Sequence, residues 1–364
     1  MGVCFRSHGY LTGRSEDLEQ AISTFHHALE RVPPTSSELV SRLFNNLGES
    51  LCDRYIRTKR IENLEQAIQA CQKSLENASP NAPNLPNFLN SLGKALFTSY
   101  EHIGSLKDLD RSIETFQRAV GLISENSVYY PSYLSNMGSS LKIRYDNTGS
   151  LKDLEQTIDV FQKAVDITTE DSPYLPGYLN NLGAGLKDLY TQTGHLDILH
   201  KANEILSQTC EIGLIRAPEV AILCAQWWGI WATERASWEE ASYAYTYAIQ
   251  AIEQLYRIQL FRASQESWLN EVQGLHAHAA YAMARACKLK DAVMAMEQGQ
   301  ARGLSEALAR DRADLKQVQL IDPNLYERYL QVADRLRYFE RTERDNNLLV
   351  LQDRAITNIT ISLI

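Results

Sequence analysis

Four amide or hydroxyl side chains recur at a fixed spacing and are suited to holding a peptide. Asn46, Ser91, Asn136 and Asn181 each lie 45 residues after the one before. An amide can donate and accept a hydrogen bond at once, so a row of amides suits the backbone of an extended peptide whatever its side chains. The alternative is that these side chains only solvate a surface or bond to neighbouring helices. The sequence leaves both interpretations open.

The residues around these positions repeat with the same period. A glycine recurs every 45 residues, preceded by Leu or Met and followed by Leu three residues later and Tyr seven residues later; the glycines are Gly48, Gly93, Gly138 and Gly183. A fixed period of about 20–50 residues indicates a repeat array. Gly2 lies 46 residues before Gly48. We therefore expect Gly2 to be the repeat glycine of an earlier unit.

Each unit is predicted to be a pair of helices, with the glycine on the first. The second carries one apolar stripe, for example Leu64, Ala67, Cys71 and Leu75, whose spacing of three and four is typical of an amphipathic helix. Glycines such as Gly149 and Gly194 suit the turn within a unit, because glycine readily takes positive φ at a helix end. The fold class is therefore all-α.

The set Gly138, Thr157, Phe161 and Ala164 resembles the signature of the tetratricopeptide repeat (TPR). The family's unit has about 34 residues, whereas here 19 residues separate Gly48 from Ala67, so these helices are longer than usual. The resemblance implies a right-handed superhelical solenoid of antiparallel hairpins. In peptide-binding members of the family, asparagines at this place grip the peptide backbone.

The period divides the chain into three predicted parts. Residues 1–209 form an array of 45-residue TPR-like repeats, the first unit incomplete. Residues 210–305 form two units of standard length, since Gly229, Ala241 and Tyr245 match the ordinary spacing. Residues 306–364 form a long linker helix and a tail. We expect the tryptophans near residue 230 to fill a wide core, and the tyrosines after each repeat glycine to pack.

The predicted binding site is the concave face of the array. At 100° per residue, one set of first-helix positions lies opposite the core stripe. The candidate peptide-binding residues there are Asn46, Ser91, Asn136, Asn181, Arg42, Asn87 and Lys94. Arg42 and Lys94 are too few cations for the carboxylate-clamp variety of the family, so binding of chaperone tails is not expected.

The segment Met296–Leu304 resembles the junction that joins such repeats to a caspase-like CHAT peptidase domain. That peptidase needs a His and a Cys within reach of each other, and no His or Cys follows Glu297. The predicted function is therefore a non-catalytic scaffold that binds a protein or extended peptide, as a sensing module of a TPR-CHAT type system. The alternatives are part of a cysteine peptidase whose catalytic domain lies outside this chain, and a structural self-association module.

Composition and the absence of known motifs argue against several other classes of function. The net charge of −9 disfavours nucleic-acid binding. There is no run of 18 apolar residues, so no membrane span is expected. Six scattered cysteines favour free thiols and a cytoplasmic location. No metal-binding or nucleotide-binding motif is present, and neither a metal nor another cofactor is expected.

Overall fold

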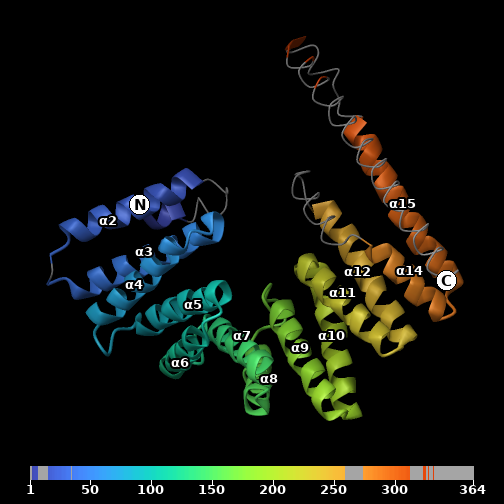
Figure 1. Cartoon of the computed structure of the whole chain (residues 1–364), viewed down its shortest axis with the longest axis horizontal. Helices are drawn as coiled ribbons and strands as arrows, with labels where there is room; N and C mark the ends of the chain where they lie inside the picture. The colour runs from blue at the N-terminus through green and yellow to red at the C-terminus, as the bar shows by residue number, and fades with distance from the viewer. Residues whose placement is uncertain are drawn as a thin grey trace, which may run out of the picture. The chain divides into compact units, whose positions relative to one another are not determined.

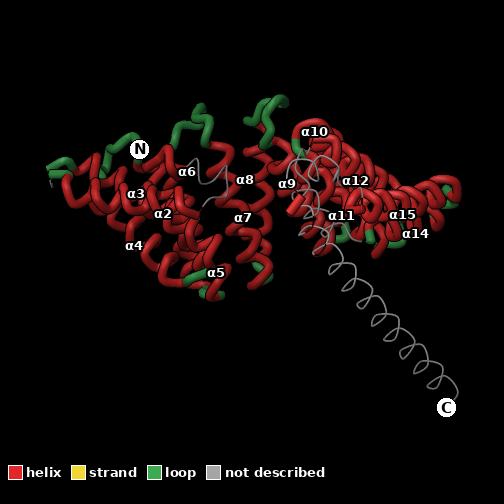
Figure 2. The backbone as a smooth tube through the Cα atoms, turned by 90° about the horizontal axis from the view of Figure 1, so that it is seen from above, coloured by secondary structure: helices red, strands yellow, loops and turns green. Residues whose placement is uncertain are grey.

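The computed structural model describes residues 2–6, 15–33, 35–258 and 274–311, together with the single positions 323, 324, 327 and 331. Every regular element among these residues is a helix, as Figure 2 shows by the absence of any strand in the part that is drawn in colour. The long helix expected beyond residue 311 and the tail lie outside the described residues. The all-α prediction is confirmed for the described part of the chain.

The helices pair into antiparallel hairpins that follow one another along the chain (Figure 1). The first helices of successive units are α3 (Ser37–Thr58), α5 (Leu85–Ile103), α7 (Tyr130–Thr148), α9 (Leu175–Thr193), α11 (Pro218–Glu234) and α14 (Leu275–Arg285). The second helices are α2 (Ser15–Arg31), α4 (Ile61–Asn77), α6 (Leu106–Leu122), α8 (Leu151–Asp166), α10 (Leu196–Arg216) and α12 (Trp238–Ile258), and α15 (Leu289–Asp311) follows α14 along the chain. The architecture is an α-solenoid of helix hairpins.

The repeat glycines hold each hairpin together because they let the two helices approach closely. A Cβ added to Gly138 would lie 2.5 Å from the ring of Phe161, and one added to Gly93 would lie 2.6 Å from Phe116. Both partners are 23 residues further along the chain, on the second helix. Gly2 meets Phe25 at the same separation, with 2.8 Å to the added Cβ. The expectation that Gly2 is the repeat glycine of an earlier unit is confirmed.

The change of unit length after residue 205 is visible in the contact between the repeat glycine and the second helix. In the α11–α12 hairpin Gly229 faces the ring of Tyr245, 16 residues later instead of 23. The hairpin is therefore shorter by seven residues, which is about two helical turns and keeps the same face toward the core. Residue 210 lies inside α10, and the chain turns into the shorter hairpin at Ala217, which is also the residue that caps α11.

The apolar residues predicted for the stripes form the core. Leu64, Ala67 and Cys71 on α4 are fully buried, as are Leu109 and Phe116 on α6. Of the four tryptophans near residue 230, Trp228 and Trp231 are buried, whereas Trp227 and Trp238 are half-buried. The prediction that these tryptophans fill a core therefore holds for two of the four.

The chain divides into two compact units, residues 1–292 and 293–364. Within the first, each helix packs on the next, and successive first helices α3, α5, α7, α9 and α11 also contact one another directly. The second helices α10 and α12 also contact each other directly, whereas α4, α6 and α8 pack mainly on the first helices beside them. The first helices thus form one continuous surface of neighbouring helices. No described helix is long and apolar enough to cross a membrane.

Candidate functional site

The predicted binding residues lie on the first helices, on the side turned away from the core. Arg42, Asn87 and Lys94 are exposed on α3 and α5. Asn46, Asn136 and Asn181 are half-buried, and Ser91 is buried with 4% of its surface exposed. We call this surface of α3, α5, α7, α9 and α11 the first-helix face.

The asparagines on this face bond to the neighbouring first helix. Asn136 Nδ2 on α7 donates to Asn90 Oδ1 on α5 at 3.0 Å, and Asn181 Nδ2 on α9 donates to Ser135 Oγ on α7 at 3.3 Å. The indole Nε1 of Trp227 on α11 continues the series with a 3.0 Å hydrogen bond to Asn180 Oδ1. These bonds join α7 to α5, α9 to α7 and α11 to α9. We call them rungs.

Part of each amide is still available to a ligand. Among the described residues, no donor bonds to the Oδ1 of Asn136 or of Asn181. Each amide also keeps a second N–H, because one rung uses only one. The sequence left two uses of the asparagines open, and the geometry provides for bonding to neighbouring helices while leaving acceptor capacity at the surface.

Ser91 departs from this pattern. Its Oγ donates to Glu49 Oε1 on α3 at 2.8 Å instead of bonding to the residue equivalent to Asn90, which is Asn45. Glu49 also forms an ion pair with Arg6, whose Nε lies 2.7 Å from Asp53 Oδ2. The carboxylates on this part of the face are thus already paired.

Burial and these charges act on a neighbouring thiol. Burial, with a smaller contribution from the Asp53 carboxylate, raises the pKa of Cys52 to about 12. The ammonium of Lys94 acts in the opposite direction and places its charge near the same cluster. Cys52 is therefore held as a neutral thiol, and nothing in this arrangement activates it as a nucleophile.

A second ion-pair cluster ties α7 to α9. Lys142 Nζ lies 2.7 Å from Asp188 Oδ2 on the next first helix and 2.7 Å from Asp146 Oδ1 on its own. Burial lowers the pKa of Lys142, but hydrogen bonds from its ammonium to Asp146 and Asp188 raise it by more, so the net shift is upward. The Lys142 ammonium is therefore already paired with two carboxylates, one of which lies on the next first helix.

Side chains on the first-helix face change in character along the chain. Two rows of equivalent positions cross the five first helices, one residue per helix. The first row is Arg42, Asn87, Ser132, Gly177 and Leu223, and the second is Glu49, Lys94, Ser139, Ala184 and Ile230. Both rows pass from charged through small polar residues to a small residue and then a branched aliphatic one. Leu223 is 47% exposed and Ile230 is 41% exposed.

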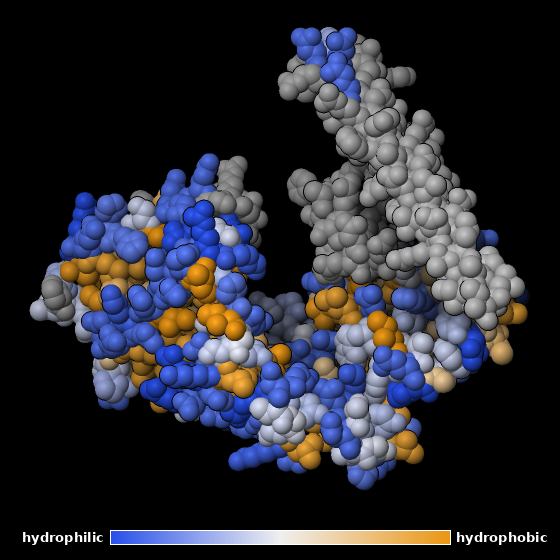
Figure 3. Space-filling view, in the orientation of Figure 1, coloured by the Kyte–Doolittle hydropathy of each residue, from blue (hydrophilic) through white to orange (hydrophobic). Residues whose placement is uncertain are grey.

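On the side drawn in Figure 3, hydrophilic and hydrophobic residues are interleaved across the hairpins. Among the described residues, no group of three or more His, Cys, Asp or Glu side chains is placed to hold a metal ion.

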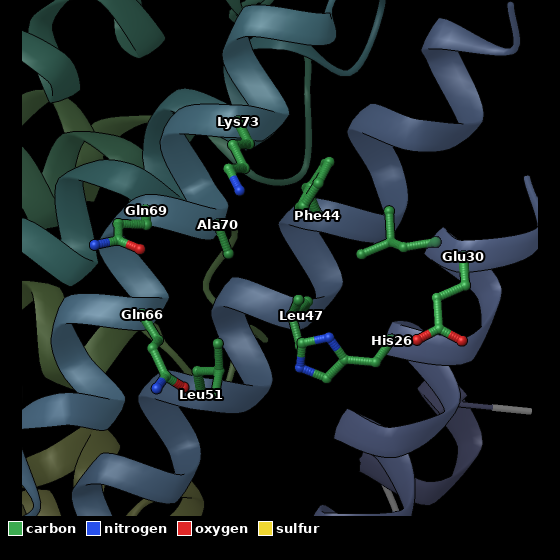
Figure 4. Close-up of a pocket in the computed structure, with 10 residues that line it drawn as sticks. His26, Glu30, Phe44, Leu47, Leu51, Gln66, Gln69, Ala70 and Lys73 are labelled. Atoms are coloured by element: carbon green, nitrogen blue, oxygen red, sulfur yellow. The ribbon is translucent and has the colours of Figure 1, made fainter. Parts of the chain in front are cut away.

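A separate pocket of about 370 Å³ lies on the opposite side of α3, between α2 and α4 (Figure 4). Phe44, Leu47 and Leu51 of α3 line it centrally, while His26 and Glu30 extend from α2 and Gln66, Gln69 and Lys73 from α4. Lys73 Nζ lies 5.6 Å from the centre of the Phe44 ring. The pocket combines an apolar floor with a polar rim. It shares no residue with the first-helix face.

No family model matches this sequence, and no curated protein matches it. Solved structures with a similar arrangement of helices do exist. The pilF protein of Pseudomonas aeruginosa has a TM-score of 0.43 and 15% identity, over 81% of this chain and 98% of that one. A putative kinesin light chain of Podosopora anserina with nearly identical TPR-like repeats has a TM-score of 0.42 and 12% identity, over 61% and 98%.

The TPR protein YrrB, described as having an unusual peptide-binding site, has a TM-score of 0.36 and 17% identity, over 58% of this chain and 86% of that one. These likenesses concern the arrangement of helix hairpins. Nothing about the partner of this chain follows from them.

Sequence reasoning found the asparagines but missed their acceptors. Asn90, Ser135 and Asn180 stand directly before Ser91, Asn136 and Asn181, so each unit presents two adjacent polar residues. That doublet was a visible signal. Comparison of equivalent positions along the repeat does not reveal these pairs, because each rung joins positions that differ by one.

Proposed function

We propose that this chain is a non-catalytic scaffold that binds a protein or extended peptide on its first-helix face, which we take to be the concave face of the solenoid. The observation that carries the proposal is a pair of partly free amides on the neighbouring helices α7 and α9. With respect to the described residues, Asn136 and Asn181 each keep an unengaged Oδ1 beside an unengaged N–H, the two groups that a peptide backbone requires.

The other proposed contacts surround this row. Asn46 occupies the same position on α3, and the exposed side chains of Arg42, Asn87 and Lys94 border it. Stacked repeats give extended surfaces of this kind, which suit a ligand longer than a single side chain. The proposal concerns a protein or peptide partner, without nucleic acid or membrane, in a reducing compartment such as the cytoplasm, where the six free cysteines would stay reduced.

The test uses Gly177, which lies one helical turn before Asn181 and has open space around it. A Cβ added there meets no atom within 4 Å, and the same is true of Gly121 on the second helix α6. Peptides would be selected on the full chain from a random displayed library, and their binding then compared for Gly177→Trp and Gly121→Trp. We expect Gly177→Trp to weaken binding at least tenfold and Gly121→Trp to leave it unchanged.

Equal effects of the two tryptophans, or peptides that bind independently of Gly177, would place the site elsewhere and overturn the proposal. Self-association through the same face is the competing use of this surface. Sedimentation velocity over a hundredfold range of concentration would detect it as a rising sedimentation coefficient that Gly177→Trp abolishes.

A regulatory role beside a peptidase is the finer form of this proposal. It is supported by the segment Met296–Leu304, which resembles the junction to a CHAT domain and whose backbone is helical within α15. Under this proposal the chain senses a partner while a His and Cys dyad outside it cleaves. The test is the coding sequence adjoining this one, which should contain a His and a Cys within a caspase-like α/β pattern.

A further inference from the structure

The two rows on the first-helix face indicate which side chains a bound peptide would carry. Equivalent residues of neighbouring first helices lie side by side, because α5 contacts α7, α7 contacts α9 and α9 contacts α11. A segment crossing these helices therefore meets the members of each row in order. It would pass from charged side chains on α3 and α5 to aliphatic ones on α11.

The α11 end offers a place for an apolar side chain. Leu223 and Ile230 are nearly half exposed, seven residues apart on one side of the helix, and Trp227 lies between them. On the adjoining helix α9 the equivalent positions are Gly177 and Ala184. A Cβ at Gly177 would meet nothing within 4 Å. The surface at Gly177 therefore has room for a ligand side chain beside Leu223 and Ile230.

At the α3 and α5 end the unpaired charges within the rows are positive. Glu49 is already paired with Arg6 and accepts the hydrogen bond from Ser91. Neither Arg42 nor Lys94 forms an ion pair with any residue in the described ranges, and both are exposed. Charge complementarity therefore favours a carboxylate in the ligand at this end.

From this gradient we infer that the first-helix face binds an extended segment of a partner protein carrying an acidic residue at the α5 end and a bulky apolar residue at the α11 end. The inference rests on the proposed function and adds the chemistry of the ligand. Three helix-to-helix steps separate Lys94 from Ile230. At about 10 Å per step and about 3.3 Å per extended residue, the two ligand residues stand about nine positions apart.

The test uses fluorescein-labelled synthetic peptides of a neutral Gly, Ser and Thr background, each with one Glu and one Leu. The two residues would be separated by five, nine or thirteen positions, in both orders along the peptide, and a further peptide would replace Leu by Ser. Fluorescence anisotropy with the full chain gives the Kd of each. We expect the nine-residue spacing in one of the two orders to bind at least tenfold more tightly than the others.

Substitutions separate the two ends of the site. Leu223→Ser with Ile230→Ser should abolish the preference for Leu over Ser and keep the preference for Glu, whereas Lys94→Ser should do the reverse. The matched controls are Leu106→Ser with Leu151→Ser, two leucines that are 48% and 51% exposed outside this face, and Lys152→Ser on α8. The controls should leave every preference unchanged.

Two outcomes would contradict the inference in distinguishable ways. Peptides that bind regardless of Glu, Leu and spacing, but are blocked by Gly177→Trp, would overturn the ligand chemistry and leave the proposed function standing. Absence of any binding that Gly177→Trp can block would overturn both. A preference that the control substitutions remove equally would assign the selectivity to another surface.

Discussion

Two hairpins with the same repeat spacing, α3–α4 around Gly48 and α7–α8 around Gly138, differ in how completely their polar groups are paired. In both, the repeat glycine packs on the second helix 23 residues later and the same apolar stripe is buried. The packing within the hairpin is therefore specified equally well in the two units. The pairing of the polar side chains at the edges of the hairpins differs between them.

An arginine at equivalent positions shows the contrast most clearly. Arg144 donates from Nε and Nη2 to the two oxygens of Asp153 at 2.9 and 2.8 Å, and from Nη1 to Asp110 on the preceding unit at 2.9 Å. Among the described residues, Arg54 bonds to Glu19 alone, at 3.1 Å, and its buried Nε has no partner there. The residue equivalent to Asp153 is Asn63, whose amide donates to Thr58 instead.

Two more positions in the Gly48 unit depart from the pattern. Asn45 Oδ1 is buried without a partner, because the residue that should donate to it is Ser91, which bonds to Glu49. Lys59 ends α3 at φ 54°, where Gly149 ends α7 at φ 69°. We conclude that core packing fixes the fold of every unit, while the paired edges set how stable each unit is.

The largest expected effect is the loss of Arg144. Arg144→Met would leave the Asp153 carboxylate, which is 7% exposed, without a counter-charge, so we expect a loss of about 2–3 kcal/mol in the free energy of unfolding. Arg54→Met should cost about 1 kcal/mol or less, because Glu19 is 58% exposed. Urea unfolding followed by circular dichroism measures both. Equal losses would remove the distinction between the units.

Supplying the missing carboxylate should repair the Gly48 unit. Asn63→Asp would offer Arg54 the bidentate partner that Arg144 has, and would add negative charge to the first turn of α4, so we expect a gain of about 1–1.5 kcal/mol. The gain should disappear in an Arg54→Met background, which is the control. A gain that persists there would come from the helix dipole alone.

The turn after α3 should improve with glycine. Lys59→Gly would relieve a side chain in the left-handed region, with an expected gain of about 1 kcal/mol. The loss of the contact between Lys59 Nζ and the Tyr55 ring, 5.7 Å away, reduces this slightly. The reverse substitution, Gly149→Lys, should destabilise by a similar amount in the same urea experiment. A loss of stability on Lys59→Gly would contradict this account of the turn.

The smallest expected effect concerns the missing rung. Ser91→Asn should let an amide donate to Asn45 Oδ1 as Asn136 donates to Asn90, giving about 0.5–1 kcal/mol. Amide hydrogen exchange in α3 and α5 is the sharper measurement, since protection should rise in both helices together. Ser139→Asn, on α7 outside the rungs, is the control and should change neither. Unchanged exchange would show that Asn45 is satisfied by other means, such as water.

Much of the fold could be predicted because it depends on residues within one hairpin. The glycines, the stripe and the turn residues repeat along the sequence, and even the shorter hairpin at Gly229 was visible as a change of spacing. The hydrogen bonds and ion pairs at the edges of the hairpins depend on how one hairpin packs against the next. This packing cannot be read from the sequence of a single unit. Thus Asn136 was identified as a surface amide, but its bond to Asn90 was one of two interpretations.

The predicted binding residues divide in the same way. The places of Arg42, Asn87 and Lys94 on the first helices follow from 100° per residue, and these three side chains are exposed. The sequence did not reveal that Ser91 is buried and that its hydroxyl bonds to Glu49 of the preceding first helix. The expected role of the Tyr residues in packing agrees with the burial of Tyr55 and Tyr145, whereas Tyr100 and Tyr190 are half-buried.

The offset of the rungs has a consequence for the length of the array. The two asparagine rungs join residues 46 apart although the repeat is 45, so each of these units needs a donor and an acceptor side by side. A chain from which residues 91–135 were deleted would join Asn90 directly to Asn136. Asn136 would then face Asn45, and Asn181 would face Asn90. Removing one whole period would therefore leave each of these amide donors opposite an acceptor. Loss or duplication of complete periods changes the number of units while the rung residues stay paired.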